Sequence, residues 1–500
     1  MSRTHQNIIA NYVGRAWSFI SAFIFVPFYL KLLGSEAYGI VGFFAVVLGF
    51  LAFADAGLTA TLNREFARSD RTLPYKANLL ATIETIYVGI CLVIIFGIWF
   101  FAPLIASKWL HSGSIPPQDI VFYVRLIGVG VALQLITSLY QGGLMGLQKQ
   151  VLANSLLVGY GVLRSGIILI PLYFFPSLST FFFWQIGVTI VYFVVLRIFV
   201  KKEVHTEKKV AFSKSTLMDV KGFAAGMLVL AVLSSILIQA DKLVVSSLFS
   251  LSEFGFYTLA STFSQIPLML VLPIGLAILP KFTQYISANN LQDTVLLFRK
   301  TNFIVVAMAS FIAFFSVAYM PDILLLWTRN VDLANSVSQV ARILCIGTLF
   351  QATQLTTYYL AIANGHTKTN ILLGICSVVF LVPALFVSIA YFGLLGAGIP
   401  WLIMSIVTFI ALGYLVLRKF TNNIFKTWLF SDTLIPFFTA VFAVGTIYLA
   451  TYNLPKGWLV FCYGVVAFTI WTLINIWLFQ RLFPEDPMFI KLKKTVFKNN

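Results

Sequence analysis

The chain has 500 residues, of which 60% are hydrophobic and only 10% are charged. Soluble domains contain about 45–50% apolar and about 25% charged residues, so this composition excludes a water-soluble fold. The net charge of +17 does not indicate nucleic-acid binding, because Lys and Arg lie almost wholly in alternate predicted loops. We therefore expect an integral membrane protein that lies in the lipid bilayer and binds no nucleic acid.

Fourteen apolar windows follow one another along the chain, and each is long enough for a transmembrane helix. Lipid-exposed segments must satisfy their own backbone hydrogen bonds, and the windows lack the short alternating pattern of a membrane barrel. The predicted fold class is therefore all-α, a polytopic membrane protein. The first window is too long for a signal peptide and is expected to be an uncleaved first span. The windows lie at 8–33, 38–62, 78–106, 120–145, 151–175, 178–200, 222–249, 254–280, 301–327, 335–363, 371–392, 395–418, 430–452 and 457–480.

The basic residues of the loops alternate between the two sides of the membrane. Loops on the side of the N-terminus carry twenty-four Lys and Arg residues, whereas the opposite loops carry four: Lys31, Lys108, Arg329 and Lys456. The positive-inside rule places the richer side in the cytoplasm, and with it both termini. A missed span would have scrambled this alternation, which supports an even number of spans.

The two halves of the chain resemble each other at a nearly constant separation. Four pairs of short segments match: 35–39 with 252–255, 55–58 with 273–276, 124–126 and Gln134 with 341–343 and Gln351, and 146–149 with 365–368. Each repeat holds six spans, an even number, so both copies enter the membrane with the same orientation. This pattern predicts two parallel six-helix lobes, as in transporters built from parallel repeats, with two further helices appended.

These repeats define the predicted domains. An N-lobe is expected over 1–200, a basic cytoplasmic linker over 201–221 and a C-lobe over 222–420. Spans 13 and 14 fall within 421–480, and a basic cytoplasmic tail occupies 481–500.

No pattern indicates a metal, a nucleotide or a catalytic centre. The four cysteines lie within apolar windows and are expected to be small buried residues, and the four histidines lack metal-ligand spacing. A Walker A motif and a catalytic triad are both missing from the sequence. We expect no cofactor, no metal and no enzymatic activity.

Six basic residues lie inside the predicted spans, where an ionisable group costs several kcal/mol unless it faces a bundle interior or water, and five of them are candidates for substrate binding. Arg164 lies roughly 20 Å into its span at 1.5 Å per residue, close to the midplane. Arg125 and Arg342 are related by the repeat and are expected on opposite walls of one cavity. Lys242 and Arg15 complete the set of candidate substrate-binding cations. Arg197 lies near a helix end and is expected to extend toward the interface instead.

Three acids share the same depth range: Asp55, Glu84 and Asp241. They either pair with the basic groups, for instance Asp55 or Glu84 with Arg15, or bind the proton or sodium ion that couples to transport. If all eight groups line one cavity, its net charge is positive, which favours an anionic substrate such as a diphosphate head group.

Several motifs resemble those of the MOP superfamily, and in particular its Wzx-type polysaccharide flippases. The resemblance covers roughly the first 420 residues and rests on segments 11–14, 33–39, 55–58, 63–64, 241–242 and 254–257, with Pro27 and Tyr29. It implies two lobes around a central cavity that opens alternately to each side. It also implies transport of a polyprenyl-diphosphate-linked oligosaccharide, such as an O-antigen or capsule unit, to the outer leaflet of a bacterial inner membrane. Polysaccharide polymerase and assembly proteins are the expected partners.

Other functions stay open at this point. Fourteen spans exceed the usual Wzx number and leave room for a MurJ-like flippase of peptidoglycan precursors. A MATE-like cation exporter would need an acidic cavity, whereas the count here is basic. A polymerase or ligase would need a long outer loop, and the longest is only about 106–119. A structural envelope protein would not need charges at the midplane.

Overall fold

A computed structural model describes residues 14, 17, 20, 21, 23–55, 57–207 and 210–484, with the side chains of 51, 52, 220–227, 229, 230 and 234 outside the description. Arg15 and most of the predicted basic tail therefore lie outside the described residues.

The described residues are almost entirely helical, with an isolated bridge between His111 and Ser250 in place of any longer strand. This confirms the all-α fold class. The elements are α2 (Ser35–Gly49), α3 (Leu51–Asp55), α4 (Leu58–Ala67), α5 (Leu73–Lys108), α6 (Pro117–Gly146), α7 (Gln150–Gly161), η1 (Val162–Ile167), α8 (Leu169–Phe174), α9 (Leu178–Glu203), α10 (Lys214–Leu248), α11 (Leu251–Ser264), α12 (Ile266–Ser287), α13 (Leu291–Ala318), α14 (Met320–Thr328), α15 (Val331–Thr353), α16 (Leu355–Ala363), α17 (Lys368–Phe392), η2 (Gly393–Ala397), α18 (Ile399–Phe420), α19 (Phe425–Leu429), η3 (Phe430–Leu434), α20 (Ile435–Ala450) and α21 (Leu459–Leu482).

Thirteen helices in the described part of the chain are long and apolar enough to cross a membrane. A shorter apolar helix, Phe23–Leu33, lies in the first predicted window. Each of the fourteen predicted windows therefore contains an apolar helix, and the prediction of about fourteen spans is confirmed. The large apolar side chains of α5, among them Phe96, Phe100 and Leu104, are exposed, as expected for a helix that faces lipid.

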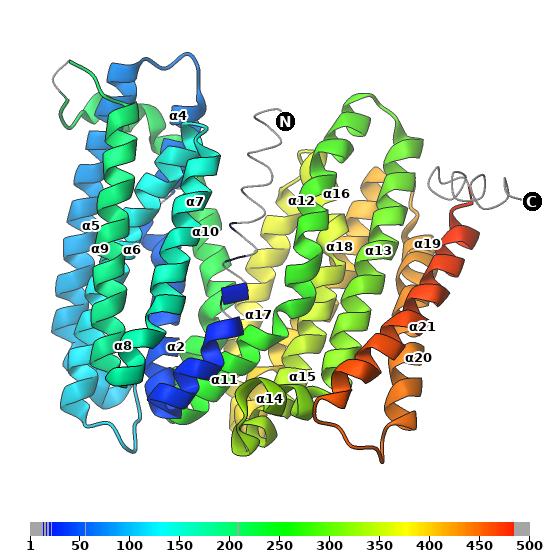
Figure 1. Ribbon diagram of the computed structural model, residues 1–500. Helices are drawn as coiled ribbons and strands as arrows, with labels where there is room; N and C mark the ends of the chain where they lie inside the picture. Colours follow the sequence, from blue (N-terminus) through cyan, green and yellow to red (C-terminus); the bar gives the residue numbers. More distant parts are fainter. Residues whose placement is uncertain are drawn as a thin grey trace, which may run out of the picture. The chain divides into compact units, whose positions relative to one another are not determined.

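The chain divides by its contacts into two compact units, Met1–Thr258 and Leu259–Asn500. Each is a bundle of long helices joined by short loops (Figure 1). Unit 1 contains α10 and the first turns of α11 in addition to the six spans of the first repeat. The lobe boundaries inferred from the repeat stay a prediction.

Close helix contacts in unit 1 depend on glycines of α6. A Cβ on Gly142 would lie 2.4 Å from a side-chain carbon of Thr59, and one on Gly146 would lie 2.5 Å from the carbonyl oxygen of Asn63. The small-xxx-small spacing of these glycines lets the backbone of α4 approach α6, as in many membrane helix pairs. This packing brings Leu62 and Phe66 of α4 into a buried apolar cluster with Tyr140 of α6.

A second close crossing joins α2 to the start of α11 within unit 1. A Cβ on Gly39 would lie 2.1 Å from the carbonyl oxygen of Leu251, and one on Gly255 would lie 2.8 Å from that of Ser35. The hydroxyl of Ser252 donates to that of Ser35 at 2.9 Å. Segments 35–39 and 252–255 are repeat-related in sequence, so the two repeats meet here at corresponding positions.

The last two spans pack against α13 in unit 2. Ala307 and Phe311 of α13 form an apolar cluster with Ala440 and Val444 of α20 and Trp471 of α21. The appended helices therefore belong to the core of unit 2.

A buried ion pair joins the start of α13 to η3. Asp432, which is fully buried, accepts from Arg299 Nε at 2.8 Å and from Nη2 at 2.9 Å. Asn302 donates to the carbonyl oxygen of Asp432 at 3.0 Å, and its own amide oxygen accepts from Trp428 Nε1 at 3.1 Å. Arg299 lies between the apolar windows 254–280 and 301–327, and its partner lies 133 positions further along the chain.

We predict that Asp432→Ala strongly destabilises unit 2, because it leaves the guanidinium of Arg299 without its buried counterion. Loss of one partner of a buried pair typically costs about 3–5 kcal/mol. The measurement is the thermal unfolding midpoint of the purified protein in detergent. Asp322→Ala is the matched control, because Asp322 pairs with Lys456 at 3.8 Å in a partly exposed position. Equal midpoints for the two variants would contradict the role given to Asp432.

Candidate functional site

Arg164 lies on a π-helical turn near the middle of the span Gln150–Phe174. Its Nε donates to Oε1 of Gln185 at 2.5 Å, and Nε2 of Gln185 donates back to the carbonyl oxygen of Arg164 at 3.2 Å. A π-helical turn is wider than an α-helical turn, and such turns occur frequently at functional sites. Gln185 is a buried residue of α9, so the two hydrogen bonds tie the π-helical turn of Arg164 to α9.

Uncharged polar side chains continue from Arg164 through the interior of unit 1. The guanidinium carbon of Arg164 lies 5.7 Å from the ring centroid of Tyr160. The hydroxyl of Tyr160 donates to Gln134 at 3.0 Å and lies 3.0 Å from the hydroxyl of Thr189. The Tyr160 ring also stacks on Tyr192 at 4.2 Å. Helices α6, α7 and α9 are thus joined by polar contacts as well as by apolar packing.

The other predicted cations have separate environments. The guanidinium carbon of Arg125 lies 4.6 Å from the ring centroid of Trp99, a half-exposed residue of α5. Lys242 donates to the carbonyl oxygen of Ile238 at 3.1 Å. In unit 2, Arg342 donates to the carbonyl oxygen of Val317 at 3.0 Å.

Hydroxyl groups donate hydrogen bonds to two of the three predicted acids. The carboxylate of Asp55 accepts hydrogen bonds from the hydroxyls of Thr59 and Tyr87, and from the Thr59 backbone at 3.3 Å. Asp241 accepts from the hydroxyl of Tyr257 at 2.6 Å, while its ammonium neighbour Lys242 lies 3.9 Å away. Among the described residues, no Lys, Arg or His lies within ion-pair distance of Asp55.

Glu84 is an ion-pair residue. Its Oε1 lies 2.9 Å from Arg197, and its Oε2 lies 3.3 Å from Lys201. Both cations lie on the last turns of α9. Arg197, which was expected to extend toward the interface, therefore has a carboxylate partner on α5.

No hydrogen bond or ion pair in the described part of unit 1 links Arg164, Arg125 and Lys242 to one another. The structure brings Arg164 together with Gln185 and Tyr160, and Asp241 together with Tyr257. The common cationic cavity, including Arg342 and Arg15, stays a prediction.

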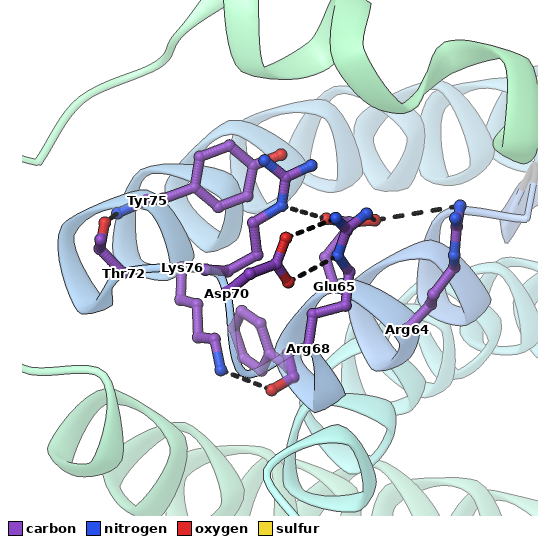
Figure 2. A network of polar contacts seen from close by, with 9 residues as sticks. Arg64, Glu65, Arg68, Asp70, Thr72, Tyr75 and Lys76 are labelled. Carbon is purple, nitrogen blue, oxygen red and sulfur yellow. Dashed lines mark hydrogen bonds and ion pairs between the residues drawn. The ribbon is translucent and has the colours of Figure 1, made fainter.

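A dense charge network follows α4 in the first predicted cytoplasmic loop (Figure 2). The buried carboxylate of Glu65 accepts from Arg71 Nε at 2.8 Å and lies 3.6 Å from Arg68 and 3.9 Å from Arg64. Arg68 also pairs with the exposed Asp70, and this hydrogen bond lowers the pKa of the Asp70 carboxyl to about 2. These loop arginines are thus partly neutralised and join the end of α4 to the start of α5.

Comparison with known proteins assigns the chain to a family. Residues 4–286, more than half of the chain, match the family described as "Polysaccharide biosynthesis protein". The chain belongs to this family. Residues 227–387 also match the family described as MatE. Membership of the MOP superfamily, in its polysaccharide branch, is thereby confirmed.

Family members and solved structures extend the match to nearly the whole chain. A putative O-antigen transporter of Shigella flexneri is 22% identical over 416 residues, which cover 83% of this chain and 97% of that protein. The lipid II flippase MurJ in an inward closed conformation superposes with a TM-score of 0.71 at 15% identity, covering 95% of this chain and 98% of MurJ. An inward-facing MATE transporter of the MOP superfamily gives a TM-score of 0.66 at 16% identity, covering 81% and 96% of the two chains. These relatives are transporters and flippases, which agrees with the prediction that this family member is not an enzyme.

Most partners of the predicted residues are uncharged polar side chains, which a count of charged residues does not identify. Gln185, Thr189 and Tyr160 carry no charge, and Tyr87 and Tyr257 read as ordinary aromatic residues of a span. A signal was present, because amide side chains such as Gln134 and Gln185 are costly in hydrocarbon unless they are hydrogen-bonded. A search for uncharged polar residues inside the windows would have found this network.

Proposed function

We propose that this protein is a flippase for a polyprenyl-diphosphate-linked oligosaccharide, which it moves from the cytoplasmic to the outer leaflet of a bacterial inner membrane. Family membership and the near-complete coverage of the putative O-antigen transporter support a role in surface polysaccharide export. Arg164 is the observation that carries the substrate class, because it is a cation near the middle of a span with a neutral partner.

A diphosphate suits such a residue for an electrostatic reason. A guanidinium at bilayer depth is costly, and a bound anion would offset much of that cost. Arginine also presents paired N–H donors that match the oxygens of a phosphate group. A cation exporter of the MATE kind would place its positively charged substrate against Arg164, so this residue favours an anionic one.

A peptidoglycan-precursor flippase is the second candidate, because MurJ superposes over 95% of this chain. Both substrates are amphiphiles whose head group carries a diphosphate, so Arg164 has the same role in either case. The family described as "Polysaccharide biosynthesis protein" favours the oligosaccharide. On this proposal the bilayer, the lipid-linked glycan and polysaccharide assembly proteins are the partners.

Transport by alternating access requires the helices of the two repeats to separate at one membrane face. The positive-inside distribution puts residues 35–39 and 252–255 on the outer side. There, Ser35 and Ser252 are hydrogen-bonded, Trp109 Nε1 donates to Ser246 at 3.0 Å, and the backbone N–H of Leu251 donates to the carbonyl oxygen of His111 at 2.7 Å. We propose that this contact separates when the protein opens outward.

Asp55 is the proposed ion-coupling residue. It is a carboxylate of a predicted span whose described partners are hydroxyl groups, whereas Glu84 is already paired with two cations. Hydroxyls hydrogen-bond both the charged and the neutral form of a carboxyl group, and their oxygens also suit a sodium ion. Asp55 therefore suits reversible binding of a proton or sodium ion better than Glu84 does.

The proposed function predicts that Arg164→Ala abolishes surface polysaccharide while the protein still reaches the membrane. Losing charge-assisted bonds to a desolvated diphosphate is expected to reduce transport by about a hundred-fold. The measurement is polysaccharide display by a strain that lacks its own copy, with membrane levels of each variant in parallel. Arg418→Ala is the control, since Arg418 is exposed and bonds Tyr414. Normal polysaccharide with Arg164→Ala would overturn the role of this residue.

Alternating access predicts that a disulfide between Ser35→Cys and Ser252→Cys arrests transport. The two hydroxyl oxygens lie 2.9 Å apart, so a cysteine pair is expected to oxidise readily. Cys376 and Cys462, which are exposed, are first replaced by Ala. Polysaccharide display is then compared under oxidising and reducing conditions, with each single cysteine variant as a control. Unchanged export by the fully cross-linked protein would show that this contact does not open.

Ion coupling predicts that Asp55→Asn removes the dependence of transport on an ion gradient. Asparagine retains a side-chain oxygen for the bonds to Thr59 and Tyr87 but cannot gain or lose a proton near neutral pH. The measurement is the flipping rate in proteoliposomes with and without a pH or sodium gradient. Glu84→Gln is the matched control and should keep the gradient response. A gradient that still accelerates Asp55→Asn would exclude Asp55 as the coupling residue.

A further inference from the structure

Gln185 contacts Arg164 with both ends of its amide group, one at the guanidinium and the other at the backbone carbonyl. The amide oxygen accepts from Nε at 2.5 Å, and the amide nitrogen donates to the carbonyl oxygen of the same arginine at 3.2 Å. An amide rotated by half a turn would face donor to donor and acceptor to acceptor, so its orientation is fixed. We propose that Gln185 is a positioning residue, which holds Arg164 so that its two terminal nitrogens meet the diphosphate of the transported lipid.

This inference rests on the flippase function proposed above and names the residue that makes Arg164 effective. With Nε bound to Gln185, the Nη1 and Nη2 donors have no partner among the described residues. These two nitrogens form the end of the guanidinium fork, the edge that meets two oxygens of a phosphate group. A long side chain fixed in this way loses less rotamer freedom when it binds, which favours affinity.

The partner of Arg164 is neutral, in contrast to the carboxylate partners of the arginines that form ion pairs. Arg197 pairs with Glu84, Arg299 with Asp432 and Arg71 with Glu65, so each of these guanidinium groups has a carboxylate partner. An amide hydrogen-bonds Arg164 without cancelling its charge, which leaves the full charge for an anionic ligand.

Gln185 is itself held firmly. It is buried with 5% of its surface exposed, and its backbone carbonyl accepts from the hydroxyl of Thr189 at 2.6 Å. Thr189 in turn contacts Tyr160, whose ring lies beside Arg164. Satisfied polar networks of this kind are rigid, so the guanidinium is expected to have one orientation before the ligand arrives.

The test measures binding of a polyprenyl diphosphate without sugar to the full-length protein purified in detergent, with inorganic pyrophosphate as a second probe. Gln185→Leu is expected to weaken lipid binding about ten-fold, the effect of one lost hydrogen bond to a charged group. Gln185→Glu is expected to keep the bond to Nε and, although it loses the donor to the Arg164 carbonyl, to lower the thermal midpoint no more than Gln185→Leu does. It should nevertheless bind as poorly as Arg164→Ala, because its carboxylate cancels the charge. A role limited to stability would not separate these two readouts.

A double-mutant cycle decides whether Gln185 acts through Arg164. If it does, Gln185→Leu has no further effect on binding in the Arg164→Ala background. Gln141→Leu is the matched control, because Gln141 bonds Tyr192 and the carbonyl oxygen of Ala153 and does not touch Arg164. This control is expected to lower the thermal midpoint while binding stays unchanged.

The outcomes separate the two proposals. Binding that Arg164→Ala reduces but Gln185→Leu leaves intact would overturn the positioning role and keep the flippase. Additive losses in the double variant would also overturn it. A wild-type protein that binds neither probe would overturn the proposed function itself. Binding of pyrophosphate alone, without preference for the lipid, would show that the site takes a free anion.

Discussion

Hydrocarbon offers no hydrogen-bond partner, and this constraint decides where the polar and charged groups of the protein lie. A carboxylate or guanidinium on a spanning helix is satisfied best by a partner on another helix, and each such partner also joins two spans. Asp432 and Arg299 join η3 to α13 in this way, and Glu84 and Arg197 join α5 to α9. The polar contacts thus specify which helices are neighbours, while apolar surface faces lipid almost everywhere else.

The fold was largely predictable because its main determinant is local. An apolar run of the right length must be a helix in a membrane, so each window could be located without knowing its neighbours. The ends were harder to place. Span 9 begins at Leu291 rather than near 301, because the polar turn that holds Arg299 extends the helix beyond the apolar window. Hydropathy therefore locates the span and misses the part of the helix that lies outside the hydrocarbon.

The candidate site was only half predictable, because its chemistry depends on residues far apart in sequence. Arg164 was identified by its depth alone, which requires nothing beyond helix geometry. Its partner Gln185 follows 21 positions later on another helix, and the pairing of Glu84 with Arg197 spans 113 positions. A count of charges could not foresee that one arginine meets an amide and the other a carboxylate. In the proposed mechanism, that difference decides which of the two arginines keeps its charge for the substrate.

The described residues contain two π-helical turns, one in a helix–helix contact and the other at the proposed binding site. Each carries a charged residue, Arg164 in η1 and Asp432 in η3. In both, an amide side chain from a neighbouring helix donates to the backbone carbonyl of that residue: Gln185 to Arg164, and Asn302 to Asp432. In η3 the charge is then cancelled by the paired donors of Arg299, and the result is a fixed helix contact. In η1 the guanidinium of Arg164 bonds the same neutral amide that bonds its backbone carbonyl. The turn is therefore held by two hydrogen bonds, and the charge of Arg164 is not cancelled. If Arg164 binds the substrate as proposed, a widened turn that is satisfied without a counterion marks the binding site better than a charged residue alone does.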